Sequence, residues 1–176
     1  MTQQFVLDLP CHVHEALWTH LLADSRGRES AAFAFVRPGA GELHTAFKCV
    51  EWFPVPEAGF TSRSAVHLEL TDSTRASVIK RAHLLDASIV EFHSHTGPWP
   101  ASFSPSDLAG FKEFVPHVRW RLKGRPYVAI VVAGDGFDGF VWAGDDLRPK
   151  QLDAIRVDAH VLDATKLTYW NGGDDE

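Results

Sequence analysis

The sequence has 176 residues, of which 45% are hydrophobic and 23% are charged, proportions that are ordinary for a soluble globular protein. The formal net charge is −6 and the 17 Lys and Arg residues are scattered, so we expect neither nucleic-acid binding nor attachment to a membrane surface. We find no apolar stretch of membrane-spanning length and no basic signal-peptide segment. Cys11 and Cys49 are too few for a disulfide framework, and we therefore expect a reducing, cytoplasmic location.

In chain order, the hydrophobic pattern alternates between strand-like and helix-like segments, which predicts an α/β fold. Strands are expected at 5–9, 29–36, 43–55, 65–70, 89–92, 126–132 and 139–142, with turns at 38–42 and 134–136. Helices are expected from His12 to about Ala23, from Thr71 or Asp72 to about Leu85, and from Pro105 to about Val115. We expect one domain over residues 1–170, in which 147–167 fit one more helix or a strand pair, and a disordered acidic tail at 171–176.

The most informative stretch runs from residue 88 to residue 107. Its apolar run, 89–92, leads to His93 and His95 at the end of a predicted strand. Side chains two residues apart on a strand point the same way, so both imidazoles can reach one point in space. After a loop containing glycine and proline, Ser104, Pro105 and Asp107 begin a helix.

Two interpretations of Ser104 and Asp107 are open. Serine before proline, with an aspartate three residues on, is typical of a helix N-terminus, where the serine is the cap and the aspartate favours the positive end of the helix dipole. Alternatively, Asp107 completes a metal site with His93 and His95, because two imidazoles and a carboxylate are typical of a catalytic zinc that leaves a fourth position for water. The same three ligands would also suit Fe(II) in an oxygenase.

Zinc hydrolysis also needs a carboxylate outside the ligand set to accept a proton from water. Glu29 is the candidate, because it stands at the start of an apolar strand, where a charged side chain is otherwise hard to place. A solvated glutamate at a strand end is the alternative.

Together, Glu29, His93-Ser94-His95 and Ser104-Pro105-Ser106-Asp107 resemble the JAMM motif of the JAB/MPN metalloproteases. That motif has an upstream glutamate, then H-x-H, seven intervening residues and S-x-x-D, and the predicted order of elements over 5–143 is similar too. The resemblance implies a JAB/MPN-like (cytidine-deaminase-like) fold, a curved mixed sheet flanked by helices with the site at one edge.

Three features depart from the family pattern. Eight residues, 96–103, separate His95 from Ser104, Thr96 stands where a proline often follows, and Glu29 lacks the common glycine three residues later. These departures affect the expected path of the loop but leave the ligand types intact.

By resemblance, the chain is expected to be a zinc-dependent isopeptidase or peptidase that cleaves after the C-terminal tail of a ubiquitin-like protein. His93, His95 and Asp107 would hold one Zn²⁺, Glu29 would move the proton, and Ser104 would donate a hydrogen bond to the oxyanion. The expected partners are a ubiquitin-like protein or its conjugates and the activating and conjugating enzymes of the same system. Small members of this kind resemble prokaryotic ones encoded in such systems, including antiviral ones.

Two other functions stay open. One is processing of the precursor tail of a sulfur carrier or small ubiquitin-like protein for biosynthesis, and the other is a non-catalytic MPN scaffold that binds a modifier or a partner. Trp99 could line the substrate channel or be a buried packing residue. The second H-x-H, His12 and His14, lies in a predicted helix, where its side chains diverge by about 200° and cannot share a metal.

Overall fold

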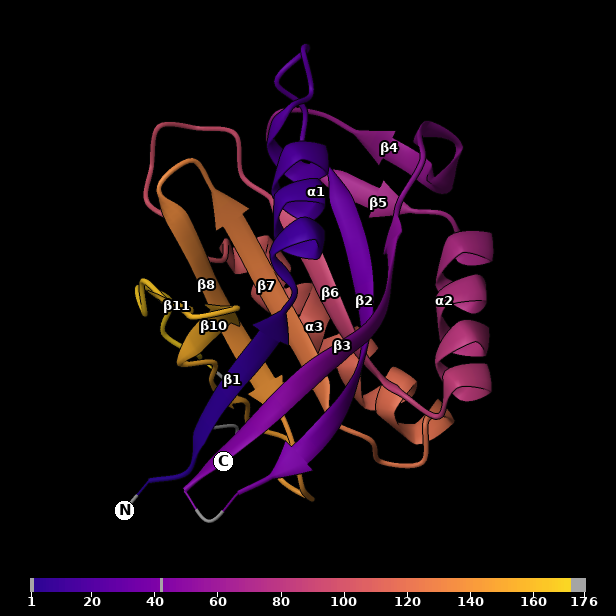
Figure 1. Cartoon of the computed structure of the whole chain (residues 1–176). Coiled ribbons are helices and arrows are strands. Elements are labelled where there is room, and N and C mark those ends of the chain that lie inside the picture. The colour runs from indigo at the N-terminus through magenta and orange to yellow at the C-terminus, as the bar shows by residue number, and fades with distance from the viewer. Residues whose placement is uncertain (1, 42, 172–176) are drawn as a thin grey trace.

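A computed structural model describes residues 2–41 and 43–171 of the chain (Figure 1). The strands are β1 (Gln4–Leu9), β2 (Ala31–Ala40), β3 (His44–Pro54), β4 (Phe60–Arg63), β5 (Leu68–Leu70), β6 (Ser88–Ser94), β7 (Tyr127–Ala133), β8 (Gly136–Trp142), β9 (Lys150–Gln151), β10 (Ala154–Val157) and β11 (His160–Asp163). The helices are α1 (Cys11–Leu22), α2 (Asp72–Leu85) and α3 (Pro105–Arg121), with a short 3₁₀ turn at Glu57–Gly59.

Within the described residues, nine strands form one sheet in the order β11-β10-β1-β3-β2-β6-β7-β8-β9, and β4 and β5 form a separate pair. The large sheet is mixed: β1 runs parallel to β3 and β10, β6 runs parallel to β7, and the other neighbours are antiparallel. The sheet is curled, with helices on both faces (Figure 1). This architecture confirms the predicted α/β class.

Alternate residues of the central strands face two separate apolar layers. Ala34 and Val90 pack in the layer that contains α1, whereas Phe33 and Ile89 pack in the layer that contains α2 and α3. β7 is buried along its whole length, as its unbroken apolar run requires of a strand covered on both faces. Burial of each large apolar side chain contributes about 1.5–3 kcal/mol, so these layers hold the strand ends that carry the site.

Several predicted boundaries were wrong. β2 continues through Pro38 to Ala40, where a turn was expected, and β4 lies in a segment for which no strand was expected. The predicted strand at 65–70 is reduced to β5. In 147–167, by contrast, β10 and β11 form an antiparallel pair, which confirms the strand-pair alternative. α3 runs past Pro116 to Arg121, because the residues after the proline place Val118 in the core and so offset the lost backbone hydrogen bond.

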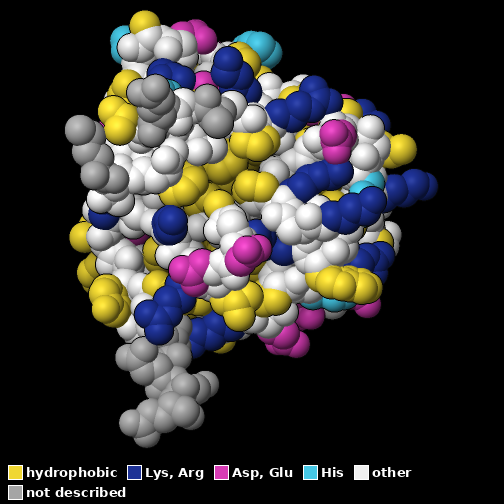
Figure 2. All heavy atoms as spheres, turned by 90° about the horizontal axis from the view of Figure 1, so that it is seen from below, with side chains coloured by type: hydrophobic (Ala, Val, Ile, Leu, Met, Phe, Trp, Pro, Cys, Tyr) yellow, Lys and Arg dark blue, Asp and Glu magenta, His cyan; other side chains and the backbone are white. Residues whose placement is uncertain are grey.

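α2 and α3, the two helices of the second layer, both begin with an acidic turn, and α3 ends with a basic one. Asp72 and Asp107 lie in the first turns of α2 and α3, whereas Arg119 and Arg121 lie in the last turn of α3. Both helices end at the bottom of Figure 1, and Figure 2 shows many Lys and Arg side chains on that lower face. Cations near helix C-termini and anions near N-termini each interact favourably with the helix dipole.

The predicted disordered tail, 171–176, lies outside the described residues except for Asn171, whose carbonyl oxygen accepts a hydrogen bond from Lys112 Nζ. No helix among the described residues is both long enough and apolar enough to span a bilayer.

Candidate metal centre

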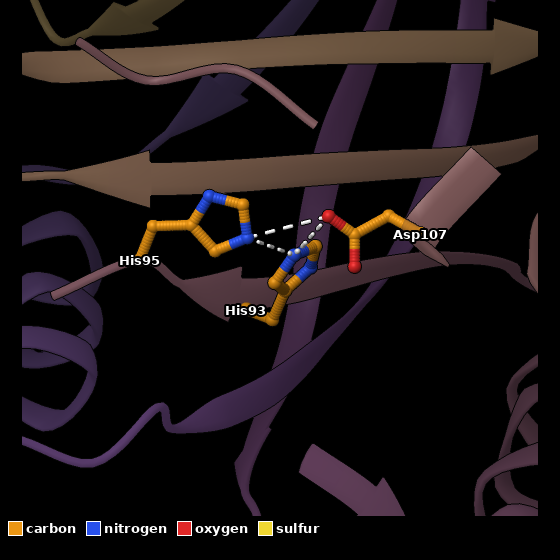
Figure 3. Close-up of side chains that lie close together, drawn as sticks. All are labelled: His93, His95 and Asp107. Atoms are coloured by element: carbon orange, nitrogen blue, oxygen red, sulfur yellow. Dashed lines mark hydrogen bonds and ion pairs between the residues drawn. The ribbon is translucent and has the colours of Figure 1, made fainter. Parts of the chain in front are cut away.

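The two histidines of the site come from the C-terminal end of β6. His93 is in the strand and His95 lies one residue beyond it, so the strand period of two directs both rings to the same side. The amide of His95 donates to the carbonyl of Val132 on the neighbouring chain segment, which keeps the backbone extended past the end of β6. In Figure 3 the two rings converge on the same point as the side chain of Asp107.

Asp107 is supplied by the first turn of α3. The Ser104 hydroxyl accepts a hydrogen bond from the Asp107 amide at 3.1 Å, and Asp107 Oδ2 accepts one from the Ser104 amide at 2.7 Å. This reciprocal capping box fixes the carboxylate relative to the helix axis. The capping interpretation is confirmed, and it is compatible with the metal interpretation because the carboxylate oxygen in the capping box also faces the imidazoles.

Three ligand atoms form an almost equilateral triangle. His93 Nε2 lies 3.3 Å from His95 Nε2, and each of these nitrogens lies 3.3 Å from Asp107 Oδ2. Two ligands of a tetrahedral ion are separated by roughly 1.6 bond lengths, which is about 3.3–3.4 Å for zinc bonds of about 2.0–2.1 Å. A single proton can bridge only one side of such a triangle, whereas a cation satisfies all three lone pairs. His93, His95 and Asp107 could thus hold a metal ion.

Glu29 reaches the same place through the sheet register. Ala31 on β2 pairs with His93 on β6, and continuing the antiparallel register two residues outward places Glu29 opposite His95. The side chain of Glu29 is 8% exposed, and its Oε1 lies 3.9 Å from His95 Nε2. It is therefore beside the triangle without being one of its corners, which is the position expected of a proton acceptor outside the ligand set.

The charges of the site are strongly coupled. Burial disfavours the charged form of Asp107, yet the positive His93 ring and hydrogen bonds from both imidazoles keep the pKa of this carboxyl well below its usual range. Burial lowers the pKa of His93, but Asp107, Glu91 and Glu29 outweigh it, so the net shift is upward. Burial raises the pKa of Glu29, and the two histidines partly oppose that shift. A carboxyl with a raised pKa is suited to hold a proton as well as to accept one.

The site opens into a cleft of about 900 Å³ that continues between α2 and α3. Glu29, His93, Ser104 and Asp107 line one end of it, and the strand β5 lines one side. Glu91, two residues before His93, lies on its floor and accepts a hydrogen bond from the Tyr127 hydroxyl. Burial raises the pKa of Glu91.

The remaining predicted residues fall into two groups. Trp99 is 76% exposed, so the interpretation of a buried packing residue was wrong. His12 and His14 lie in α1, where His14 stacks on Trp18, and they do not converge on one metal.

Three residues around Glu29 were missed in the sequence. The Ser94 hydroxyl accepts a hydrogen bond from the Ser30 amide at 2.8 Å, and Arg63 donates to the carbonyl of Glu29 at 3.0 Å. Ser94, between the two histidines of the H-x-H, and Ser30, next to Glu29, both adjoin candidate site residues in the sequence. Arg63 becomes adjacent to the site only through tertiary pairing.

Comparison with protein-family models finds no match for this chain, and a search among curated proteins finds none either.

Proposed function

We propose that this chain is a zinc-dependent isopeptidase or peptidase of the JAB/MPN (JAMM) type, which cleaves after the C-terminal tail of a ubiquitin-like protein. The observation that carries the proposal is the 3.3 Å triangle of two imidazole nitrogens and one carboxylate oxygen with a buried glutamate beside it. The order of these residues in the chain also matches the JAMM pattern.

The set of donors favours zinc hydrolysis over iron oxygenation. Fe(II) oxygenases share the two-histidine, one-carboxylate set, but their chemistry gives no role to a proton acceptor at the position of Glu29 or to a hydroxyl donor at Ser104. When bound, zinc supplies Lewis acidity that polarises a carbonyl and lowers the pKa of water to about 7.

The residues of the chain supply the remaining steps. Glu29 accepts the proton of the attacking water and returns it to the departing amine, acting first as base and then as acid. The Ser104 hydroxyl uses its oxygen to cap α3, which leaves its hydrogen to donate to the oxyanion of the substrate carbonyl. Asp107 and the two histidines would hold the metal, and the capping box of α3 fixes Asp107.

The cleft favours a thin, extended substrate. One edge of β5 pairs with β4, and among the described residues no strand occupies its other edge. Residues of β5 line the cleft that leads to His93 and Asp107. A Gly-Gly tail could add to this edge through backbone hydrogen bonds, and its lack of side chains would let it pass the rim of the site.

Two other functions, precursor processing and a non-catalytic scaffold, make different demands on this site. Processing of a linear precursor for biosynthesis differs only in the leaving group, an α-amine instead of the ε-amine of lysine. A scaffold would need neither bound zinc nor Glu29. Activating and conjugating enzymes would be the partners of a deconjugating enzyme, as in the antiviral systems of bacteria.

The test uses the purified chain and two peptide probes ending in Gly-Gly, one joined to a lysine ε-amine and the other to an α-amine. We expect one zinc per chain, cleavage that a chelator abolishes and zinc restores, and a loss in kcat of about 10²–10⁴-fold in Glu29→Gln with zinc retained. His12→Ala, in the other H-x-H, is the matched control and should keep both zinc and activity. A chain without stoichiometric zinc would indicate a scaffold, and full activity in Glu29→Gln would reject Glu29 as the base.

A further inference from the structure

Arg63, at the end of β4, donates hydrogen bonds to the backbone of Glu29 and to the side chain of the next residue, Ser30. Its Nε donates to the Glu29 carbonyl at 3.0 Å, and its Nη2 donates to the Ser30 hydroxyl at 2.7 Å. The side chain is only 10% exposed, although it belongs to a strand of the small outer sheet. A guanidinium held this far from water must have its donors satisfied, and the contacts to Glu29 and Ser30 are two of them.

Two acids and one ring hold the guanidinium in place. Nη1 donates to Glu57 at 2.7 Å, Nη2 lies 3.3 Å from Asp24, and the guanidinium carbon lies 4.6 Å from the ring centroid of Phe60. All three guanidinium nitrogens thus have an oxygen partner. The planar fork cannot turn without breaking several of these bonds together.

The segment that carries Glu29 is fixed by individual hydrogen bonds and not by regular secondary structure. Residues 27–30 precede β2 and form neither helix nor strand. The Glu29 amide donates to the Ser64 carbonyl at 2.7 Å, so residues 63 and 64 bond to both sides of the Glu29 peptide. On the opposite side, Ser30 is joined to Ser94, which lies between the two candidate metal ligands.

From this arrangement we propose that Arg63 is a positioning residue, which holds the Glu29 carboxylate at the distance from the metal centre that proton transfer requires. The inference rests on the proposed function of Glu29 as the proton acceptor. Because β4 pairs with β5, the same guanidinium also joins the proposed substrate-binding edge to the base. A displacement of about 1 Å at such a group is enough to lower the rate about a hundredfold.

Arg28 provides a matched control. It binds the same two acids, with Nη2 at 3.0 Å from Asp24 and Nη1 at 2.9 Å from Glu57. No hydrogen bond joins its guanidinium to Glu29 or Ser30. Arg28→Gln therefore removes one cation from the same network while leaving the contacts of Arg63 with the Glu29 segment in place.

The experiment compares Arg63→Gln with Arg28→Gln in the zinc-loaded chain, using the two Gly-Gly probes. We expect Arg63→Gln to lower kcat about tenfold to a hundredfold, with KM within about twofold and zinc affinity unchanged, because substrate and metal contacts remain. Arg28→Gln should keep kcat within about twofold. A kcat loss in Arg63→Gln no larger than that in Arg28→Gln, or a rise in KM alone, overturns the proposal.

Hydrogen exchange of the Glu29 and Ser30 amides in the zinc-free protein gives a readout that does not depend on activity. Exchange should be faster in Arg63→Gln than in Arg28→Gln, and equal rates overturn the proposal. If the wild-type chain cleaves neither probe, the proposed function fails while this comparison still decides the positioning of Glu29. If Arg63→Gln does not fold, Ser30→Ala replaces it, because it removes only the hydrogen bond from Arg63 Nη2 to the Ser30 hydroxyl. Its kcat should fall and its Glu29 amide exchange should rise, each by less than expected for Arg63→Gln.

Discussion

The hydroxyl of Ser104 caps α3 and still has a hydrogen to donate. Its oxygen accepts the hydrogen bond from the Asp107 amide that caps α3, so its hydrogen can donate toward the cleft that it lines. Thr71 caps α2 in the same way, accepting from the Thr74 amide. The two caps differ in that Ser104 borders the candidate metal centre.

This difference gives a prediction. Ser104→Ala and Thr71→Ala should each lower the free energy of unfolding by about 1 kcal/mol, the usual cost of a lost N-cap, in denaturant titrations. Only Ser104→Ala should also lower kcat, by about 10²–10³-fold, since it alone removes the proposed oxyanion donor. Equal kcat values in the two variants would show that Ser104 is a cap and no more.

At the scale of residues, local spacing was sufficient to identify most of the candidate site. Strand parity predicted that His93 and His95 converge, and helix-start chemistry predicted the place of Asp107, both of which the geometry bears out. The partnership of Glu29 with His95 depends on the pairing of Ala31 with His93, which the family pattern suggested and local sequence alone could not. Arg63 is 34 residues from Glu29, and nothing in the sequence marks it among the other basic residues.

At the scale of elements, the C-terminal segment around Thr168 is hydrogen-bonded both to β8 and to the loop that leads into α3. Asp138 on β8 is fully buried and accepts hydrogen bonds at 2.9 Å from the Thr168 amide, the Gln151 side chain and the Gly139 amide. The Thr168 hydroxyl accepts in turn from the Phe103 amide at 2.8 Å, one residue before Ser104. Phe103 also contacts the His93 ring, at 5.8 Å between ring centroids.

Removal of the Asp138 carboxylate should lower the stability of the fold. We expect Asp138→Ala to lower the free energy of unfolding by about 2 kcal/mol, because the buried Gly139 amide and the part-buried Thr168 amide lose this acceptor. Asp163→Ala, on the exposed strand β11, is the control and should stay within about 0.5 kcal/mol of wild type. Chemical denaturation of the zinc-free proteins measures both values, and similar stability of the two variants would contradict the bracing role of Asp138.

Elements with strong patterns were predictable, and those defined by tertiary pairing were not. α1, α2 and β7 follow from clear apolar periodicity or an unbroken apolar run. β4 and β9 to β11 have two to four residues each, too few for a period to show, and they exist because neighbouring strands supply hydrogen-bond partners. The continuation of α3 through Pro116 likewise reflects packing that overrides a local preference.

On the scale of the whole molecule, arginine–carboxylate pairs should contribute to stability that is lost in acid. Hydrogen bonds from Arg28 hold the pKa of Asp24 below its usual range, and those from Arg28 and Arg63 lower the pKa of Glu57. Hydrogen bonds from Arg81 lower the pKa of Glu51. A lowered pKa in the folded state gives stability that is present above the unfolded values, about 3.9 for Asp and 4.3 for Glu, and is lost as the pH falls through the folded values.

We therefore expect the free energy of unfolding of the zinc-free protein to fall as the pH is lowered from about 5 to about 2. Asp24→Asn removes one of the titrating groups, so its stability should depend less steeply on pH below about 4 than that of wild type. Unfolding titrations at a series of pH values measure both curves, and parallel curves would mean that Asp24 contributes nothing to acid sensitivity.

The position of β1 has a consequence for synthesis on the ribosome. β1 lies between β3 and β10, and its ladder with β10 joins Val6 to Ala154 and Leu9 to Val157. A nascent chain that has just exposed Asp107 carries every candidate metal ligand, yet β1 and β6 each lack one neighbouring strand. Such open edges can pair with other chains, so the growing polypeptide remains vulnerable to aggregation until β10, which ends at Val157, has left the exit tunnel.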